Sequence, residues 1–246
     1  MEGAKPCVTP VSATDKLSSS SGELLSNPIE YRSLVGALQY LTWTRPDITY
    51  AVNLVCQYMQ HPTTTHLIAS KRILRYIKGT LDFGLKFTRG SSFLLGFSDA
   101  DWAGSIDDRR STRGYCVFLG SNIISWSSKK QTTVARSSTE AEYRTLAHSA
   151  AEMVWICYLL NDLHFPISES LFKGNLWMVY VHTLDQIADI FTKGLHSPRF
   201  LFLRDKLMVV QIPISFRGDN NIVIKVTDVT AQDMEAVQDK GNCSAG

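Results

Sequence analysis

The sequence has little net charge, few cysteines and no long apolar run, and each shortage excludes a class of protein. Its 25 lysines and arginines nearly balance 23 aspartates and glutamates, so the net charge of +2 favours a polyanionic partner only where basic residues cluster. Its apolar runs fall far short of the ~20 residues that a membrane span needs, so no membrane partner is expected. The opening stretch, MEGAKPCVTPVSATDK, lacks the basic-then-apolar order of a secretory signal.

The cysteines form no recognisable framework. Five are scattered along the 246 residues, an odd number that is typical of reduced thiols, so we expect an intracellular protein, cytoplasmic or nuclear. Glycine-rich phosphate loops of the GxGxxG and GxxxxGK types are absent. His61 and His66 have no cysteine pair or HExxH motif beside them, so zinc is not expected.

Hydrophobic residues make up 44% of the sequence, enough for a core, and they begin after a polar segment. Residues 1–28 are predicted to be a flexible linker, because they hold too little apolar surface to offset the entropy of ordering. Residues 29–88 are predicted to form a small helical unit. Apolar residues recur at helical spacing in 31–43, 48–59 and 64–79, with a break at Arg45-Pro46-Asp47 and a stop at Gly79.

From residue 89 the apolar period changes to that of an α/β domain, predicted over 89–196. The predicted elements, in order, are strands at 93–97, 115–120 and 122–128, a helix at 138–163, a strand at 177–181 and a helix at 183–195. Gly120-Ser121 is expected to join the second and third strands in a hairpin. This β-β-β-α-β-α order predicts a mixed sheet covered by helices, and residues 197–246 are expected to be a partly disordered extension.

Acidic side chains gather where the predicted strands end and the helices begin. They are Asp99 and Asp101 after the first strand, Glu140 and Glu142 in the first turn of the long helix, and Asp185 and Asp189 after the last strand. Carboxylates at one edge of a sheet suit Mg²⁺, and two such ions ~3.5–4 Å apart promote phosphodiester hydrolysis. The alternative is structural: the glutamates favour the positive helix N-terminus, and the aspartates cap or turn. Helical geometry, at ~100° per residue, does not choose between Glu140 and Glu142.

Basic residues form three clusters beside aromatic residues. They are Lys71, Arg72, Arg75 and Lys78 next to Tyr76, then Arg109, Arg110 and Arg113 after Trp102, and Lys129 and Lys130 after Trp126. Taken singly, each cluster is better explained as a solvated surface. Together they favour a surface that follows a phosphate backbone, which makes nucleic acid the expected partner.

Six strings of residues are long enough to be specific. They are YRSLVGALQYLTWTRPDITYAVN, KRILRYIKGT, GFSDADWAG, DDRRSTRGYCVFLG, ISWSSKKQTTVARSSTEAEY and VHTLDQIADIFTKGL. These strings resemble the C-terminal part of the Pol polyprotein of copia-type retrotransposons, over residues 25–210. Residues 25–88 are similar to the end of its reverse transcriptase and 93–195 to its ribonuclease H domain. The resemblance implies a ribonuclease-H-like fold, ancestrally part of a larger polyprotein, that cut the RNA strand of an RNA–DNA hybrid.

The same resemblance implies a catalytic and metal-binding role for three carboxylates. Asp99 in GFSDADWAG is similar to the first catalytic residue of the family, Glu142 in STEAEY to the second, and Asp189 in DQIAD to the last. The implied cofactor is a pair of Mg²⁺ ions, with Mn²⁺ as a substitute. The paired aspartates of the family's polymerase palm have no counterpart, since Asp107-Asp108 lies in a polar, basic loop, so no polymerase activity is expected.

One central strand of the family is missing from this sequence, near residues 164–175. There the family has a Cys-Asp-Asn-type motif with a further catalytic carboxylate, whereas this segment contains Glu169 and no aspartate. Without that strand, the strand at 177–181 shifts by ~4.8 Å or leaves an edge open, and Asp189 shifts with it. Because catalytic groups need placement within about 0.5 Å, hydrolysis is expected to be impaired.

Three hypotheses follow from this reasoning. The chain is a metal-dependent nuclease in which Asp101 or Glu169 replaces the lost ligand, a non-catalytic nucleic-acid-binding remnant, or a decayed reading frame without activity. Cooperative unfolding separates the third hypothesis from the others, and salt-dependent binding of hybrid tests the second.

Overall fold

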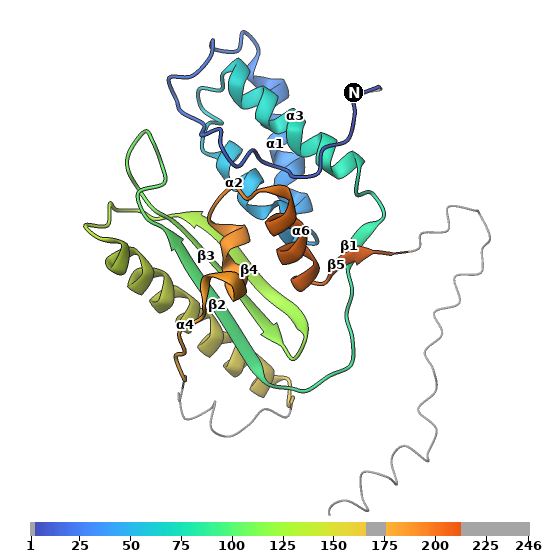
Figure 1. Ribbon diagram of the computed structural model, residues 1–246, viewed down its shortest axis with the longest axis vertical. Helices are drawn as coiled ribbons and strands as arrows, with labels where there is room; N and C mark the ends of the chain where they lie inside the picture. Colours follow the sequence, from blue (N-terminus) through green and yellow to red (C-terminus); the bar gives the residue numbers. More distant parts are fainter. Residues whose placement is uncertain (1–2, 166–175, 213–246) are drawn as a thin grey trace, which may run out of the picture. The chain divides into compact units, whose positions relative to one another are not determined.

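The structure, a computed structural model, describes residues 3–165 and 176–212, which belong to one compact unit running to Pro213. Its helical part comprises α1 (Pro28–Leu41), the 3₁₀ helix η1 (Pro46–Ile48), α2 (Thr49–Cys56) and α3 (Thr64–Lys78), grouped beyond one end of a sheet (Figure 1). These elements confirm the predicted helices and the break after the first. Within the described ranges, no helix combines the length and apolar composition needed to cross a bilayer.

The break at Arg45-Pro46-Asp47 is fixed by a buried ion pair. The Arg45 guanidinium lies 2.8 Å from the Asp47 carboxylate, to which Tyr76 of α3 donates a 2.6 Å hydrogen bond. Arg45 also donates to the carbonyl and the hydroxyl of Thr80. Because a buried charge is tolerated only when it is paired and hydrogen-bonded, this network holds η1 against α3.

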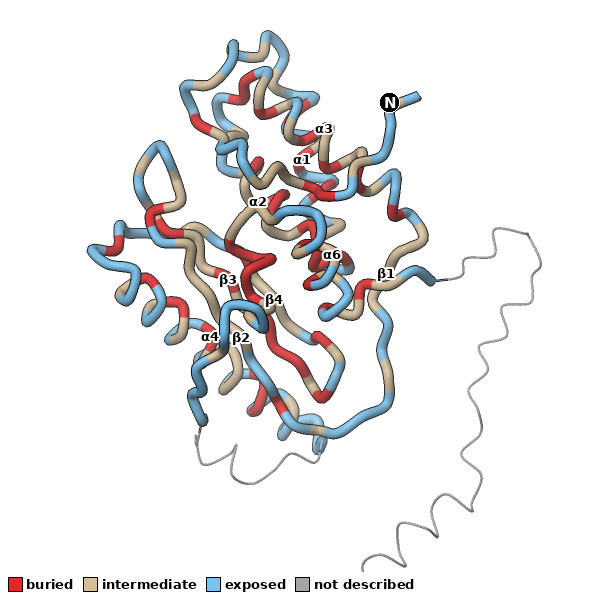
Figure 2. The backbone as a smooth tube through the Cα atoms, in the orientation of Figure 1, coloured by how far each residue is buried: buried red, intermediate tan, exposed pale blue. Residues whose placement is uncertain are grey.

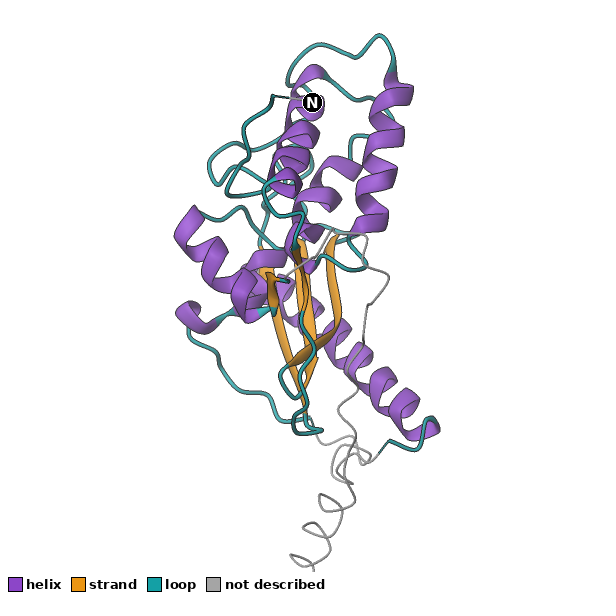
Figure 3. Ribbon diagram, turned by 90° about the vertical axis from the view of Figure 1, so that its right-hand side faces the viewer, coloured by secondary structure: helices purple, strands orange, loops and turns teal. Residues whose placement is uncertain are grey.

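The sheet has three antiparallel strands in the order β2-β3-β4. They are β2 (Leu94–Asp101), β3 (Thr112–Leu119) and β4 (Asn122–Lys130). Gly120 has a φ of +60° in the turn between β3 and β4, which confirms the predicted hairpin. Figure 3 shows the sheet edge-on, with α4 (Ser138–Asp162) against one face and η3 (Ile187–Phe191) against the other. The α/β class and the long helix are as predicted, but in the described part of the chain every strand pair is antiparallel.

The two elements predicted after the long helix are wrong. Residues 177–181 form no strand, and Trp177 and Tyr180 are 90% and 84% exposed. An apolar run needs a paired neighbour to become a strand, and among the described residues β2 has no partner on its outer edge. The helix predicted at 183–195 is two 3₁₀ helices, η2 (Thr183–Asp185) and η3, because the intervening Gln186 is extended.

The segment predicted to be a flexible linker packs against the helices where it is described. Thr9 and Ser18 are buried, and Leu17 and Leu25 pack against the core. Its few apolar residues, together with hydrogen bonds such as that from Leu25 to the carbonyl of Pro62, are enough to hold it.

The extension predicted from residue 197 also begins with ordered elements. Residues 197–212 form α6 (Ser197–Lys206) and β5 (Val209–Gln211), which pairs with β1 (Phe83–Leu85). Phe200 and Leu203 bury the apolar side of α6, a helical spacing that the sequence carries. The rest of the extension lies outside the described residues, as do residues 166–175, including Glu169, of the segment 164–175 where a strand is predicted to be missing.

The N-terminal helices, η3, α6 and the sheet share one core, and a separate, smaller buried cluster lies between the sheet and α4. The fully buried members of the shared core include Tyr31 and Ile73 from the helical part, Cys116 from β3, Phe191 from η3 and Leu203 from α6. Figure 2 shows this buried layer running from the helices onto the sheet. The boundary predicted near residue 88 therefore divides the sequence but not the core.

Gly114 allows η3 to pack closely against the sheet, because it has no side chain. A Cβ at this position of β3 would lie 2.6 Å from the Cβ of Phe191 and 3.1 Å from its carbonyl carbon. We therefore expect Gly114→Ala to lower the free energy of unfolding by about 1–3 kcal/mol, measured by urea denaturation. The matched control is Gly36→Ala, because Gly36 lies in α1 with nothing within 4 Å of the added methyl group. That control should stabilise by about 0.5–1 kcal/mol. Equal effects of the two substitutions would contradict the close approach of η3.

Candidate carboxylate site at the edge of the sheet

A cavity of about 490 Å³ lies at the outer edge of β2 and brings together the three carboxylates assigned from the family resemblance. Asp99, Glu142 and Asp189 all line it, together with Tyr143 and Lys193. Asp99 comes from β2, Glu142 from α4 and Asp189 from η3. Three segments that are far apart in the sequence therefore meet at this edge.

The strand pleat sets the direction of Asp99. Side chains alternate along β2, and a Cβ at Gly96 would meet Met153 of α4, so Gly96 faces that helix. Asp99 therefore points to the opposite face with Phe97, toward η3. Asp189 lies there, 6% exposed.

The two glutamates at the start of α4 differ in their contacts. Glu140 lies 2.6 Å from Arg144 and accepts a hydrogen bond from the backbone N–H of Arg136, so it stabilises the start of the helix. These contacts lower the pKa of Glu140, the hydrogen bond from Arg136 having the largest effect. Glu142 is exposed and lines the cavity.

Lys193 joins the two aspartates. Its ammonium lies 2.8 Å from Oδ1 of Asp189 and 3.2 Å from Oδ2 of Asp99. Arg199 approaches the other oxygen of Asp189 at 3.3 Å, and the hydroxyl of Thr192 donates to Asp99. Burial alone would lower the pKa of Lys193, but the charges of Asp99 and Asp189 outweigh it and raise the pKa. The negative charge of the aspartates is thus compensated by groups of the chain itself.

This arrangement does not fit the pair of divalent cations that the resemblance implies. Within residues 3–165 and 176–212, no three Asp, Glu, His or Cys side chains converge in a way that could hold a metal ion. Asp99 and Asp189 both pair with the ammonium of Lys193. Their oxygens are therefore already occupied and are not free to coordinate Mg²⁺. A divalent ion would have to displace Lys193 first.

Of the two predicted substitute ligands, Asp101 and Glu169, only Asp101 lies in the part of the chain that the structure describes. Asp101 shares a strand face with Asp99, but it is not among the residues that line the cavity, and burial raises its pKa. Asp185, another acidic residue of the predicted cluster, is exposed on η2.

The sequence patterns did not predict Lys193, Thr192 and Arg199 as residues of the site. Asp189 and Lys193 are four residues apart, which is the spacing of an ion pair on one helical turn. This spacing predicts the pair only when both residues are assigned to the same turn.

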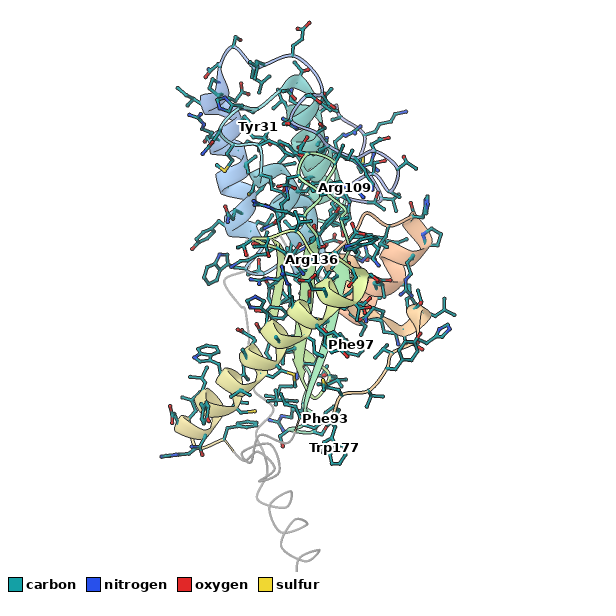
Figure 4. All side chains as sticks on the ribbon, turned by 90° about the vertical axis from the view of Figure 1, so that its left-hand side faces the viewer. Tyr31, Phe93, Phe97, Arg109, Arg136 and Trp177 are labelled. Carbon is teal, nitrogen blue, oxygen red and sulfur yellow. The ribbon has the colours of Figure 1, made fainter. Side chains whose placement is uncertain are left out.

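The predicted nucleic-acid residues differ in their exposure and in the contacts that they make. Arg72 is used internally, donating to the carbonyl and hydroxyl of Thr9, whereas Lys71 on the same helix is exposed and Arg75 is half-buried. In the loop before β3, Arg109 is exposed, and Asp108 lies 3.5 Å from Arg110 and 2.9 Å from Lys130. Arg113 and Lys129 are direct cross-strand neighbours on β3 and β4. Figure 4 shows that Arg109 lies toward the same end of the sheet as Arg136, away from Phe93.

The chain is similar to retrotransposon polyproteins over most of its length. It is 45% identical over 249 residues to the Retrovirus-related Pol polyprotein from transposon RE1 of Arabidopsis thaliana, which covers 86% of this chain and 17% of that protein. It is 43% identical over 252 residues to the corresponding polyprotein from transposon RE2 of the same plant, covering 87% and 17%. An uncharacterized mitochondrial protein of Arabidopsis thaliana is 55% identical over 157 residues, 63% of this chain and 65% of that protein.

No family model and no solved structure matches the chain. The chain spans about 17% of the length of the two polyproteins.

Replacing the shared ammonium tests the arrangement of the site. We expect Lys193→Met to leave Asp99 and Asp189 mutually repelling and to lower the free energy of unfolding by about 1–3 kcal/mol. Mn²⁺ should then raise the melting temperature of the variant more than that of the unaltered protein, because two carboxylates become available to it. The double variant Lys193→Met, Asp99→Asn should lose this response. An equal Mn²⁺ effect on the unaltered protein and on Lys193→Met would contradict the blocking role of Lys193.

Proposed function

This chain belongs to the Pol polyproteins of copia-type retrotransposons, and we propose that it is a ribonuclease-H-like protein that binds RNA–DNA hybrid but hydrolyses it poorly. The ancestral activity is hydrolysis of the RNA strand, with Mg²⁺ or Mn²⁺ at Asp99, Glu142 and Asp189. Its ancestral context is a larger polyprotein.

The contact of Lys193 with Asp99 and Asp189 carries the proposal of impaired hydrolysis. Two-metal hydrolysis depends on carboxylates that are free to hold cations. Here the two most buried carboxylates of the cavity are already neutralised, at 3.2 and 2.8 Å. Divalent ions therefore compete with an ammonium that is tethered to the site and has no translational entropy to lose.

The lengths of the matched segments support the loss of an internal piece. The match to the RE1 polyprotein covers 249 residues, whereas 86% of the 246 residues of this chain is about 212. About 37 positions of the match thus have no residue of this chain opposite them. That number of positions exceeds what a strand with flanking turns or a helix requires.

The surroundings of β2 also support that loss. Among the described residues β2 has an open outer edge, and the apolar residues 177–180 lie exposed instead of pairing in a sheet. Exposed strand edges are normally covered or paired in stable proteins. A missing central strand accounts for both observations.

Binding of nucleic acid rests on residues that the missing piece does not touch. Lys71, Arg109 and Lys129 are exposed, and Trp102 presents 47% of its surface to solvent. Exposed cations and an exposed aromatic ring are the groups that hold phosphates and bases.

The four described cysteines are free thiols, which supports the proposal of a reducing, intracellular location, cytoplasmic or nuclear.

The test is a paired measurement on a labelled RNA–DNA hybrid. We expect the full chain to bind it with an affinity that falls steeply with salt, a log–log slope of about −3 corresponding to about three phosphate contacts. Cleavage in Mg²⁺ or Mn²⁺ should be slow and only slightly faster than that by the Asp99→Asn variant, which lacks one ligand.

Rapid, metal-dependent cleavage that Asp99→Asn abolishes would show that a substitute ligand completes the site, and the proposal of impairment would be wrong. Binding that does not change with salt would contradict the phosphate-binding surface. A chain without cooperative unfolding would favour the decayed reading frame over both.

A further inference from the structure

A second cavity, of about 440 Å³, lies on the other flank of α4. Glu142, Tyr143 and Leu146 line the carboxylate cavity, whereas Arg144 and His148 of the same helix line this one. Its remaining wall comes from Arg113 of β3 and from Gln131, Thr132 and Thr133 just after β4. The lining is therefore basic and rich in hydrogen-bond donors, and it contains no carboxylate.

The charge of Arg113 has no counter-ion in the described part of the chain. Arg113 pairs across the strands with Lys129, so two positive side chains stand opposite each other on the α4 face of the sheet. Like charges in this position repel and are normally avoided. The Nε of Arg113 is buried and has no hydrogen-bond partner, which is costly for a charged donor. An anion in the cavity would remove both penalties.

His148 and Arg144 also indicate an excess of positive charge in this cavity. Burial and the charges of Arg113 and Lys129 lower the pKa of His148, which indicates a positive field. Arg144 is held in place by Glu140, 2.6 Å away, and donates to the hydroxyl of Thr133. Arg144 is thus positioned, while Arg113 and Lys129 supply charge that nothing described neutralises.

We propose that this cavity binds a phosphate group, the phosphodiester of a nucleic-acid strand, with Arg113 as its principal ligand. Lys129, the cross-strand neighbour of Arg113, does not line the cavity and contributes only its nearby positive charge. A guanidinium offers a planar fork of donors that matches phosphate oxygens. The assignment to nucleic acid rests on the proposed function, whereas the binding of phosphate does not.

The position of the cavity suits a strand that also reaches the carboxylates. The two cavities lie on opposite flanks of one helix, whose diameter with side chains is about 10–12 Å. At about 3.4 Å of rise per nucleotide, that separation corresponds to about three nucleotides. A phosphate held by Arg113 would anchor a strand a short distance from Asp99 and Glu142.

The first experiment uses inorganic phosphate and the full chain. Phosphate should raise the pKa of His148, followed by NMR of its imidazole, because a bound anion favours the protonated ring. Arg113→Gln should weaken this response by at least about tenfold, and Lys129→Gln, an exposed position that does not threaten folding, by several-fold. Arg89→Gln, an exposed arginine outside the cavity, is the matched control and should change nothing. If phosphate leaves His148 unchanged in the unaltered protein, the cavity is not a phosphate site.

The second experiment separates the two sources of phosphate. With a short RNA–DNA hybrid, Arg113→Gln should reduce the salt slope of binding by about 1, whereas Arg89→Gln should not. A response to inorganic phosphate without any effect of Arg113→Gln on hybrid binding would mean a free-anion site and would overturn the assignment to nucleic acid. Hybrid binding by a protein whose His148 ignores phosphate would leave the proposed function standing and remove this inference alone.

Discussion

The approach of η3 to the β2–β3 pair is the constraint on which the rest of the structure depends. It is possible only because Gly114, the residue opposite Asp99, has no side chain. Once η3 is in place, Phe191 enters the core, and Asp189 and Lys193 reach the edge of the sheet. The chain then continues into α6 and β5. A single glycine thus connects the packing of the core with the electrostatics of the site.

Sequence reasoning succeeded where a local pattern was sufficient. The helices of the N-terminal part follow from apolar spacing and stop signals, and the hairpin follows from Gly120-Ser121. It failed where the outcome depends on a distant neighbour. The run at 177–181 has the composition of a strand, but no described strand pairs with it. The helical spacing of Phe200 and Leu203 was assigned to an extension, although α6 completes the core.

The candidate site, like the fold, could be predicted only in part. The three carboxylates assigned by resemblance line one cavity, whereas spacing alone left Glu140 and Glu142 equivalent. The contacts of Lys193 were not predicted, because they join Asp99 of β2 to a residue 94 positions further along the chain. The helix α4 separates two cavities. Carboxylates line the cavity on one flank of the helix, and Arg113 and His148 line the cavity on the other.

The shared core has a consequence for how such a sequence is inherited. Tyr31 and Ile73 on one side of residue 88 and Phe191 and Leu203 on the other are buried in one cluster. A genomic fragment that began or ended near residue 88 would encode two halves with exposed apolar faces, and neither would have a complete interior. A folding module of this chain therefore needs residues from both sides of residue 88.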